Sequence, residues 1–249
     1  MAWHAPRWVL PAVLVLCCAQ PAAQTAAQTI ETLTEDSSYS YLHNGRVSGA
    51  AARIVEAVLQ EAGLLDYHMG LYPWARAYDR ALREPDMLIY PIMRTPGRES
   101  SFKWVGQLDL VMPSFYKLAE APGIDVASLE DAKHYRVGVV RDDTREKFLQ
   151  EQGFTRLVVA PNNLDNFNRL LGGQVQLVPM PERDARKLCQ DAHIPYETLE
   201  KTYTLDALNS AVYMAFSRAT DDEVVHRARA AFARLSSAGV IQRILQEQP

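Results

Sequence analysis

The loop over residues 94–98 carries the residue types best suited to holding an anion. It contains Arg94, Thr95 and Arg98, and it follows residues 87–92, a short run that is apolar throughout. Such a run is typical of a strand covered on both faces. Ligands of open α/β sheets lie beyond the carboxyl ends of the strands, where this loop would be. Arginine suits a carboxylate there because its guanidinium donates two parallel hydrogen bonds.

Each of these arginines also has a structural interpretation. Arg98 either clamps a carboxylate or pairs with an acid such as Glu99, and its position in the loop favours the clamp. Arg94 is balanced between a ligand contact and a solvated surface residue. Trp74, which follows Pro73 at an expected helix start, is either a wall for the ligand or the anchor of its helix face.

Acidic and hydroxyl groups stand at two further expected helix starts. Asp143 and Thr144 precede a helix, where they serve as N-cap groups or as ligand contacts. Glu182 follows Pro181, and acids are favoured at helix starts by the helix dipole alone. Thr220 and Glu223 predict a capping box for a later helix.

Expected strands and helices alternate along the chain, which predicts an α/β architecture with a sheet between helices. The strands are expected at residues 29–34, 65–71, 87–92, 136–140, 157–159, 175–178 and 211–216, and the helices at residues 49–62, from 73, from 144, 163–171, from 220 and 240–245.

Composition narrows the class of function. The chain has 249 residues, of which 48% are hydrophobic, so it can form a sizeable core or two lobes. Its net charge of −4 gives nothing that attracts a phosphate backbone, so no nucleic-acid partner is expected. No nucleophile elbow, zinc-protease motif or phosphate loop is present, and the histidines lack metal-ligand spacing. We therefore expect no catalytic residue, metal or cofactor.

The first residues have the character of a secretory signal. Arg7 precedes an apolar stretch over residues 8–19, and residues 20–28 are rich in alanine and glutamine. The apolar stretch is shorter than the roughly 20 residues that a spanning helix needs. We predict a cleavable signal peptide over residues 1–27 and a periplasmic location. A lipid anchor on Cys17 or Cys18 is the less favoured alternative, and cleavage leaves Cys189 as a packed, unpaired thiol.

A set of motifs resembles a known family. The run Arg94-Thr95-Pro96-Gly97-Arg98, with Phe102 and Val105-Gly106 after it, is similar to the first lobe of bacterial extracellular solute-binding proteins of family 3, the amino-acid-type binders that serve ABC importers. Pro73-Trp74-Ala75-Arg76 is typical of one divergent branch. The resemblance implies an α/β, two-lobed periplasmic binding fold of type II, in which each lobe is a mixed sheet flanked by helices and two crossings act as hinges.

The resemblance also implies lobe boundaries and a function. Residues 28–110 and 217–249 would form the first lobe, and residues 111–216, with the hinge strands, the second. A monomer would capture a small polar, carboxylate-bearing solute between the lobes for an ABC permease. Two alternatives stay open: a ligand sensor that presents its closed state to a membrane receptor, and an enzyme similar to cyclohexadienyl dehydratase, with Glu35 or Glu182 as its general acid or base.

The family pattern carries roles onto particular residues. The arginine aligned with Arg98 clamps the ligand carboxylate, and Glu35 and Tyr39 lie in the loop after the first strand. Asp142-Asp143-Thr144 replaces a Gly-Thr-Thr loop that binds the carboxylate, and an acid there attracts a cation instead. The aspartate that holds an amino group falls near Pro181, beside Glu182. The predicted ligand-binding set is Glu35, Tyr39, Trp74, Arg94, Thr95, Arg98, Asp143, Thr144 and Glu182.

Overall fold

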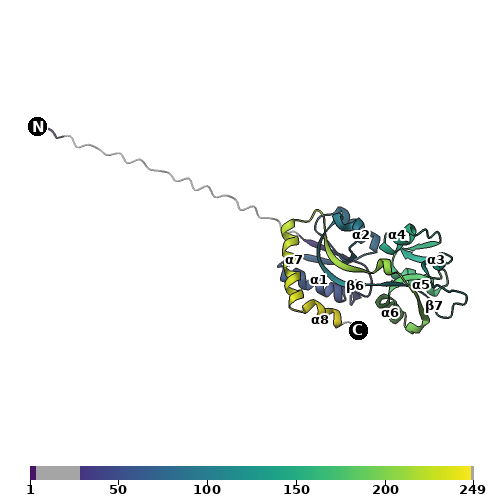
Figure 1. Ribbon diagram of the computed structural model, residues 1–249. Helices are drawn as coiled ribbons and strands as arrows, with labels where there is room; N and C mark the ends of the chain where they lie inside the picture. The colour runs from purple at the N-terminus through teal and green to yellow at the C-terminus, as the bar shows by residue number, and fades with distance from the viewer. Residues whose placement is uncertain (4–28, 248–249) are drawn as a thin grey trace.

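A computed structural model describes residues 1–3 and 29–247, and the predicted signal peptide therefore lies almost wholly outside the described residues. The chain forms two α/β bodies that lie side by side (Figure 1). None of the helices in the described ranges has the length and apolar character needed to cross a bilayer.

The first lobe is built on a mixed five-stranded sheet in the order β4-β1-β5-β12-β6. β1, β4 and β5 are parallel, whereas β12 runs antiparallel to both β5 and β6. The strands are β1 (Ile30–Thr34), β4 (Tyr67–Leu71), β5 (Met87–Met93), β6 (Phe102–Val111) and β12 (Ser210–Ser217).

Helices cover both faces of this sheet, as the apolar run in β5 predicts. Leu88 and Tyr90 pack in the core cluster that contains α1, α7 and α8, whereas Ile89 packs with α2 on the opposite face. Successive strand residues point to opposite faces, so every position of a strand between two helix layers must be apolar. The helices are α1 (Ala50–Glu61), α2 (Trp74–Arg83), α7 (Asp222–Ser237) and α8 (Val240–Gln246).

The second lobe has smaller sheets and two core clusters of its own. β7 (Pro113–Leu118) lies between β10 (Val178–Pro181) and β11 (Leu199–Thr204), while β8 (Val137–Val140) pairs with β9 (Leu157–Ala160). The helices are α3 (Leu129–Ala132), α4 (Thr144–Glu151), α5 (Asn163–Leu171) and α6 (Glu182–Asp191). Short 3-10 turns η1 (Pro96–Ser101), η2 (Tyr196–Thr198) and η3 (Asp206–Leu208), and the hairpin β2 (Tyr41–His43) and β3 (Arg46–Ser48), complete the chain.

The connections between the sheets lie close to the predicted hinges. The chain leaves the five-stranded sheet at Val111 and re-enters it at Ser210. β12, predicted as the return crossing, pairs along its length with β6 in that sheet. The lobe boundaries at 110/111 and 216/217 stay a prediction.

Two local predictions need correction. α7 is capped by Asp221, whose side chain accepts from the N–H of Glu223, so the Thr220 capping box is wrong. The Thr220 hydroxyl bonds Ser217 instead, because both are buried. The predicted strand 175–178 starts at Val178, since before it only Leu177 bridges to β8. Cys189 is buried and free, as expected.

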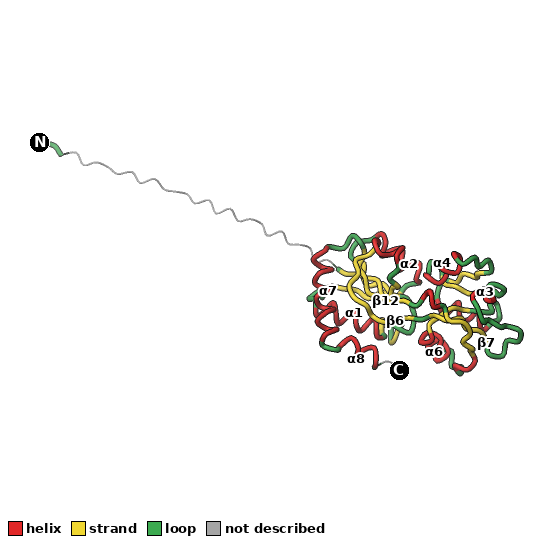
Figure 2. The backbone as a smooth tube through the Cα atoms, in the orientation of Figure 1, coloured by secondary structure: helices red, strands yellow, loops and turns green. Residues whose placement is uncertain are grey.

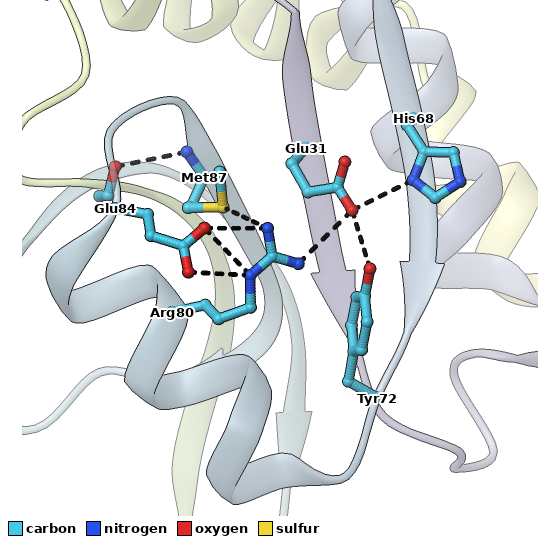
Figure 3. Close-up of polar contacts among 7 residues, drawn as sticks. Glu31, His68, Tyr72, Arg80, Glu84 and Met87 are labelled. Atoms are coloured by element: carbon cyan, nitrogen blue, oxygen red, sulfur yellow. Dashed lines mark hydrogen bonds and ion pairs between the residues drawn. The ribbon is translucent and has the colours of Figure 1, made fainter.

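A polar network joins α2 to β1, the strand next to the β4 edge of the first sheet. The carboxylate of Glu31 on β1 accepts from the hydroxyl of Tyr72 at 2.8 Å and lies 3.5 Å from Arg80 of α2. Figure 3 shows Arg80 between Glu84 of its own helix end and Glu31, with His68 and Tyr72 reaching Glu31 from the β4 side. This anchoring holds the start of α2, and therefore Trp74, at a defined place.

The loop after β1 is held by a glycine. Gly49, just before α1, has φ 106°, and a Cβ atom there would lie 2.4 Å from the carbonyl oxygen of Tyr39. Only glycine combines that backbone conformation with so close an approach. The N–H of Ala51 also donates to the Tyr39 carbonyl at 3.0 Å. The start of α1 thereby fixes Tyr39.

Candidate functional site

A cavity of about 70 Å³ lies where the two lobes meet, which is room for several water molecules at about 10–15 Å³ each. The starts of α2 and α4 face each other across this junction (Figure 2). The lining residues from the first lobe are Glu35, Ser37, Tyr39, Trp74, Pro91, Met93, Arg98, Val111 and Val212, and those from the second are Pro113, Asp143, Thr144, Arg145, Asn163, Pro181 and Asp184.

The cavity brings together part of the predicted set. Glu35, Tyr39, Trp74, Arg98, Asp143 and Thr144 line it, whereas Arg94, Thr95 and Glu182 do not. Four polar residues that the sequence reasoning missed, Ser37, Arg145, Asn163 and Asp184, line it as well.

Arg98 is the cation of the first-lobe wall. Arg98 is only 5% exposed. Its guanidinium lies over the rings of Trp74 and Tyr78, 5.3 and 4.8 Å from their centroids. Nη1 donates to the carbonyl of Met93 at 3.3 Å, but Nη2 is buried and has no hydrogen-bond partner among the described residues. Buried polar groups are normally paired, and an unpaired one on a charged side chain is costly. An anion in the cavity would supply the missing acceptor.

Arg94, from the same loop, has a different environment. Its guanidinium donates to both oxygens of Glu99 and lies over the rings of Trp104 and Tyr213. Its side chain is 39% exposed. Pairing with Glu99, one interpretation weighed for Arg98, is thus made by Arg94. Thr95 contributes its carbonyl, which accepts from the N–H of Arg98 at 2.9 Å.

An ion pair occupies the second-lobe wall. Asp143 caps α4 by accepting from the N–H of Arg145, and the Arg145 guanidinium returns to the same carboxylate with Nε 2.6 Å from Oδ1 and Nη2 3.1 Å from Oδ2. Nη1 of Arg145 donates to the carbonyl of Pro179. Burial alone would raise the pKa of Asp143, but Arg145 holds it below its ordinary value and Arg98 adds to that effect. Asp143 is therefore an anion at neutral pH.

Glu35 has the opposite electrostatic environment. Burial, reinforced by the charges of Asp143 and Asp184 and partly offset by Arg145, raises the pKa of Glu35 to about 8. The side chain is therefore mostly protonated at neutral pH and can donate a hydrogen bond. Its Oε2 also accepts from Nδ2 of Asn163 at 3.4 Å.

Direct hydrogen bonds join the lobes around the cavity. Nε1 of Trp74 donates to the carbonyl of Asp142 at 3.1 Å, and the N–H of Ser38 donates to Oδ1 of Asp184 at 2.9 Å. Asp142 has φ 59°, a left-handed conformation that aspartate adopts more readily than most residues. That conformation explains how Asp142 stands where the resembling family has glycine. These contacts describe a closed arrangement of the lobes.

Glu182 and Asp184 show why the sequence reasoning chose one acid of α6 and missed the other. Glu182 pairs with Arg186 one turn later at 2.6 Å, and 44% of its side chain is exposed. Asp184, also in the first turn, is 8% exposed and lies against the other lobe. Residues two apart on a helix do not share a face. The helical period alone could have shown that Glu182 and Asp184 lie on different faces of α6. It could not show which of the two faces packs against the first lobe.

The geometry suits non-covalent capture of a small anion-bearing molecule. Arg98 offers an unpaired donor, and the hydroxyl of Thr144 lies at the start of α4, where backbone dipoles favour negative charge. Among the residues that the structure describes, no cluster of three or more His, Cys, Asp or Glu side chains is arranged to hold a metal ion.

Comparison with known proteins identifies the fold. No family model matches the sequence, and no curated protein matches it. Solved structures do: EhuB in complex with hydroxyectoine has a TM-score of 0.79 at 16% identity, covering 89% of this chain and 88% of the matched chain. A histidine kinase sensor domain with similarity to periplasmic binding proteins has a TM-score of 0.77 at 18% identity, covering 89% and 96%. AbpA, an amino acid ABC transporter substrate-binding protein from Streptococcus pneumoniae bound to L-arginine, has a TM-score of 0.75 at 13% identity, covering 89% and 94%. The chain therefore has the two-lobed periplasmic-binding-protein fold.

Proposed function

We propose that this protein is a periplasmic solute-binding protein that captures a small polar, carboxylate-bearing solute, of amino-acid type, between its lobes for an ABC importer. The observation that carries the proposal is Nη2 of Arg98, a buried guanidinium nitrogen with no partner on the wall of an interlobe cavity. The solute carboxylate would accept from this nitrogen. The fold shared with AbpA and EhuB supports the same class of function.

Capture would be coupled to closure of the lobes. A solute that contacts Arg98 on one wall and Thr144 on the other binds the closed form better than the open form, and it can shift the equilibrium only by that difference. The lobe–lobe hydrogen bonds of Trp74 and Ser38 add to the stability of the closed form. A permease would then read closure as the sign of a bound solute.

The proposed ligand contacts are Glu35, Tyr39, Trp74, Arg98, Asp143 and Thr144, joined by the newly found Asp184 and Asn163. Arg94, Thr95 and Glu182 would act at most indirectly, since none of them lines the cavity. The proposed mature protein begins after residue 27 and works as a monomer in the periplasm. N-terminal sequencing of the exported protein and light scattering test these two points.

A sensor is the second candidate function. The observation in its favour is the histidine kinase sensor domain, which shares the fold over 96% of its own length. A sensor would use the same cavity and differ only in the partner that recognises the closed form. Uptake of a labelled ligand by cells with and without this chain separates the two functions, because a sensor leaves uptake unchanged.

The binding test starts with a thermal-shift screen of amino acids, organic acids and polyamines. A true ligand raises the melting temperature because it binds only the native state. For each hit, calorimetry then compares the wild type with Arg98→Met and with the matched variant Arg94→Met. Loss of one charge-assisted contact predicts roughly a 10- to 100-fold weaker Kd for Arg98→Met only.

Two results would contradict the proposal. Equal affinity of Arg98→Met and wild type removes the clamp. The second is turnover: if NMR shows that the protein converts a cyclic carboxylic acid, the dehydratase alternative holds and solute capture does not. Glu35 is the acid in the cavity that such an enzyme would use.

A further inference from the structure

A second cavity, of about 250 Å³, adjoins the candidate site. The two share Ser37, Asn163 and Asp184 as lining residues, so they are neighbours on either side of these side chains. The remaining lining comes from the loop after β1 and from α5 and α6: Asp36, Ser38, Leu164, Asn168, Lys187, Leu188, Asp191 and Ala192.

Two buried side chains of this cavity have unmet polar capacity. Ser38 is 6% exposed, and its hydroxyl has no hydrogen-bond partner within residues 29–247. Asp184 is 8% exposed, and its carboxylate is met by the backbone N–H of Ser38 but by no cation within 4.0 Å in the described part of the chain. Arg145 acts on Asp184 only through its charge at longer range. A buried carboxylate with no cation at ion-pair distance, beside a buried hydroxyl, suits a donor that carries positive charge.

The charge balance of the cavity points the same way. Its acids are Asp36, Asp184 and Asp191, and its one cation among the lining residues is Lys187. Lys187 pairs with Asp191, one of these three acids, and lies over the ring of Tyr41 at 4.8 Å, which leaves Asp36 and Asp184 without an ion pair from the lining residues. Burial raises the pKa of Asp36, Lys187 opposes that rise, and Asp191 and Asp184 add to it. An ammonium group in the cavity would pair with the acids that Lys187 leaves without an ion pair.

Resting on the proposed carboxylate clamp, we propose that this second cavity is a subsite for an ammonium group that the solute carries several bonds away from its carboxylate. The carboxylate would lie at Arg98, and the ammonium would donate to Asp184, Asp36 and the hydroxyl of Ser38. The intervening methylenes would contact Leu188 of α6 and Ala192, which follows the helix. The solute class is an ω-amino carboxylate rather than a carboxylate without a distal cation.

The test uses paired chain-length series on the full mature protein. Calorimetry measures the straight-chain ω-amino acids from β-alanine to 6-aminohexanoate beside the unsubstituted alkanoates from propanoate to hexanoate. At the best chain length the amine should improve Kd about tenfold or more, the effect of one charge-assisted hydrogen bond. The variant Asp36→Asn with Asp184→Asn should lose that gain, so that its ω-amino acids bind no better than alkanoates of the same chain length. Asp165→Asn on α5, which pairs with Arg169 and lines neither cavity, should keep the gain.

The outcomes separate this subsite from the clamp. Alkanoates that bind through Arg98 with no gain from the amine overturn the subsite and leave the proposed function standing. An amine gain that survives in the double variant also overturns the subsite. If no compound of either series binds, the subsite is overturned and the proposed function still rests on its own screen. If compounds bind equally well to wild type and Arg98→Met, both proposals fail. Circular dichroism of each variant checks that lost binding is not lost folding.

Discussion

The two walls of the interlobe cavity handle charge in opposite ways. On the first-lobe wall, Arg98 is buried against aromatic rings and keeps an unpaired nitrogen. On the second-lobe wall, Asp143 and Arg145 are nearly as buried, with side chains 12% and 11% exposed, yet they satisfy each other. An unpaired donor can bind a solute, whereas a paired donor stabilises the folded protein. The difference separates a residue poised to bind from residues that hold the wall together.

Breaking the second-wall pair should give the largest loss of stability. Arg145→Ala leaves the anion of Asp143 buried without its cation, and the loss of one partner of a buried pair costs about 3 kcal/mol or more. Urea unfolding of the ligand-free protein measures this. The double variant Asp143→Asn with Arg145→Ala keeps a capping residue and removes both charges, so it should lose less than Arg145→Ala. Equal losses would mean that the pair is effectively solvated.

Glu35 should make the stability depend on pH. The folded protein keeps a proton on Glu35 up to about pH 8, whereas the unfolded chain releases it near 4.5. The folded state therefore binds more protons between these values, and the contribution of Glu35 to stability declines as pH rises through that window. Glu35→Gln stays neutral, so its melting temperature relative to wild type should rise by several degrees between pH 5 and pH 8.5.

Glu182→Gln provides the contrasting variant for this pH dependence. Arg186 lowers the pKa of Glu182, so Glu182 stabilises the folded state above its ordinary pKa and loses that effect as the pH falls. This pH dependence is opposite to that of Glu35. It is also small, because 44% of the Glu182 side chain is exposed. If the melting temperature of Glu182→Gln relative to wild type rose as much as that of Glu35→Gln, the pH dependence would not be due to the buried Glu35.

Trp74→Phe should loosen the contact between the walls. It removes the donation from Nε1 to the carbonyl of Asp142, a neutral hydrogen bond worth about 1 kcal/mol. Trp104→Phe is the matched control, because Nε1 of Trp104 donates to the carbonyl of Glu99 within the first lobe. Both variants should unfold more easily, but only Trp74→Phe should increase the radius of gyration in solution scattering. Equal radii would show that this bond does not hold the lobes closed.

Arg94→Ala should give the smallest effect. Its pair with Glu99 is exposed, and such pairs contribute about 0.5 kcal/mol or less to stability. Thermal unfolding should shift by about 2 °C or less. A larger loss would show that the stacking of Arg94 on Trp104 and Tyr213 matters more than its ion pair.

Local patterns predicted the elements well. The apolar stripe of α1, the proline before α2 and the continuous apolar run of β5 each describe an interaction within one element or with a covering layer, and the structure has all three. The capping box predicted at Thr220 was wrong because Thr220 and Asp221 are neighbours and either can cap a helix. Thr220 is buried and hydrogen-bonds Ser217, so Asp221 caps α7.

The candidate site was less predictable. Arg94 and Arg98 have the same type and the same loop, so only their surroundings distinguish them: Arg98 turns under Trp74 and Tyr78, and Arg94 turns outward to Glu99. Arg145 was missed because its side chain pairs with Asp143, the N-cap residue of its own helix, and no sequence spacing predicts that contact. Asp184 was missed because α6 is amphipathic without showing which polar face meets the other lobe.

The order of residues was sufficient for the α/β layers, for the helix starts at Trp74 and Thr144, and for an arginine in the loop beyond β5, because each follows from contacts between near neighbours in the chain. Which charges lie unpaired at the junction of the lobes depended on the approach of segments more than 100 residues apart, such as Ser38 and Asp184. Only that approach removes water from both partners, and the removal of water decides whether a charge is paired, neutralised or left free for a solute.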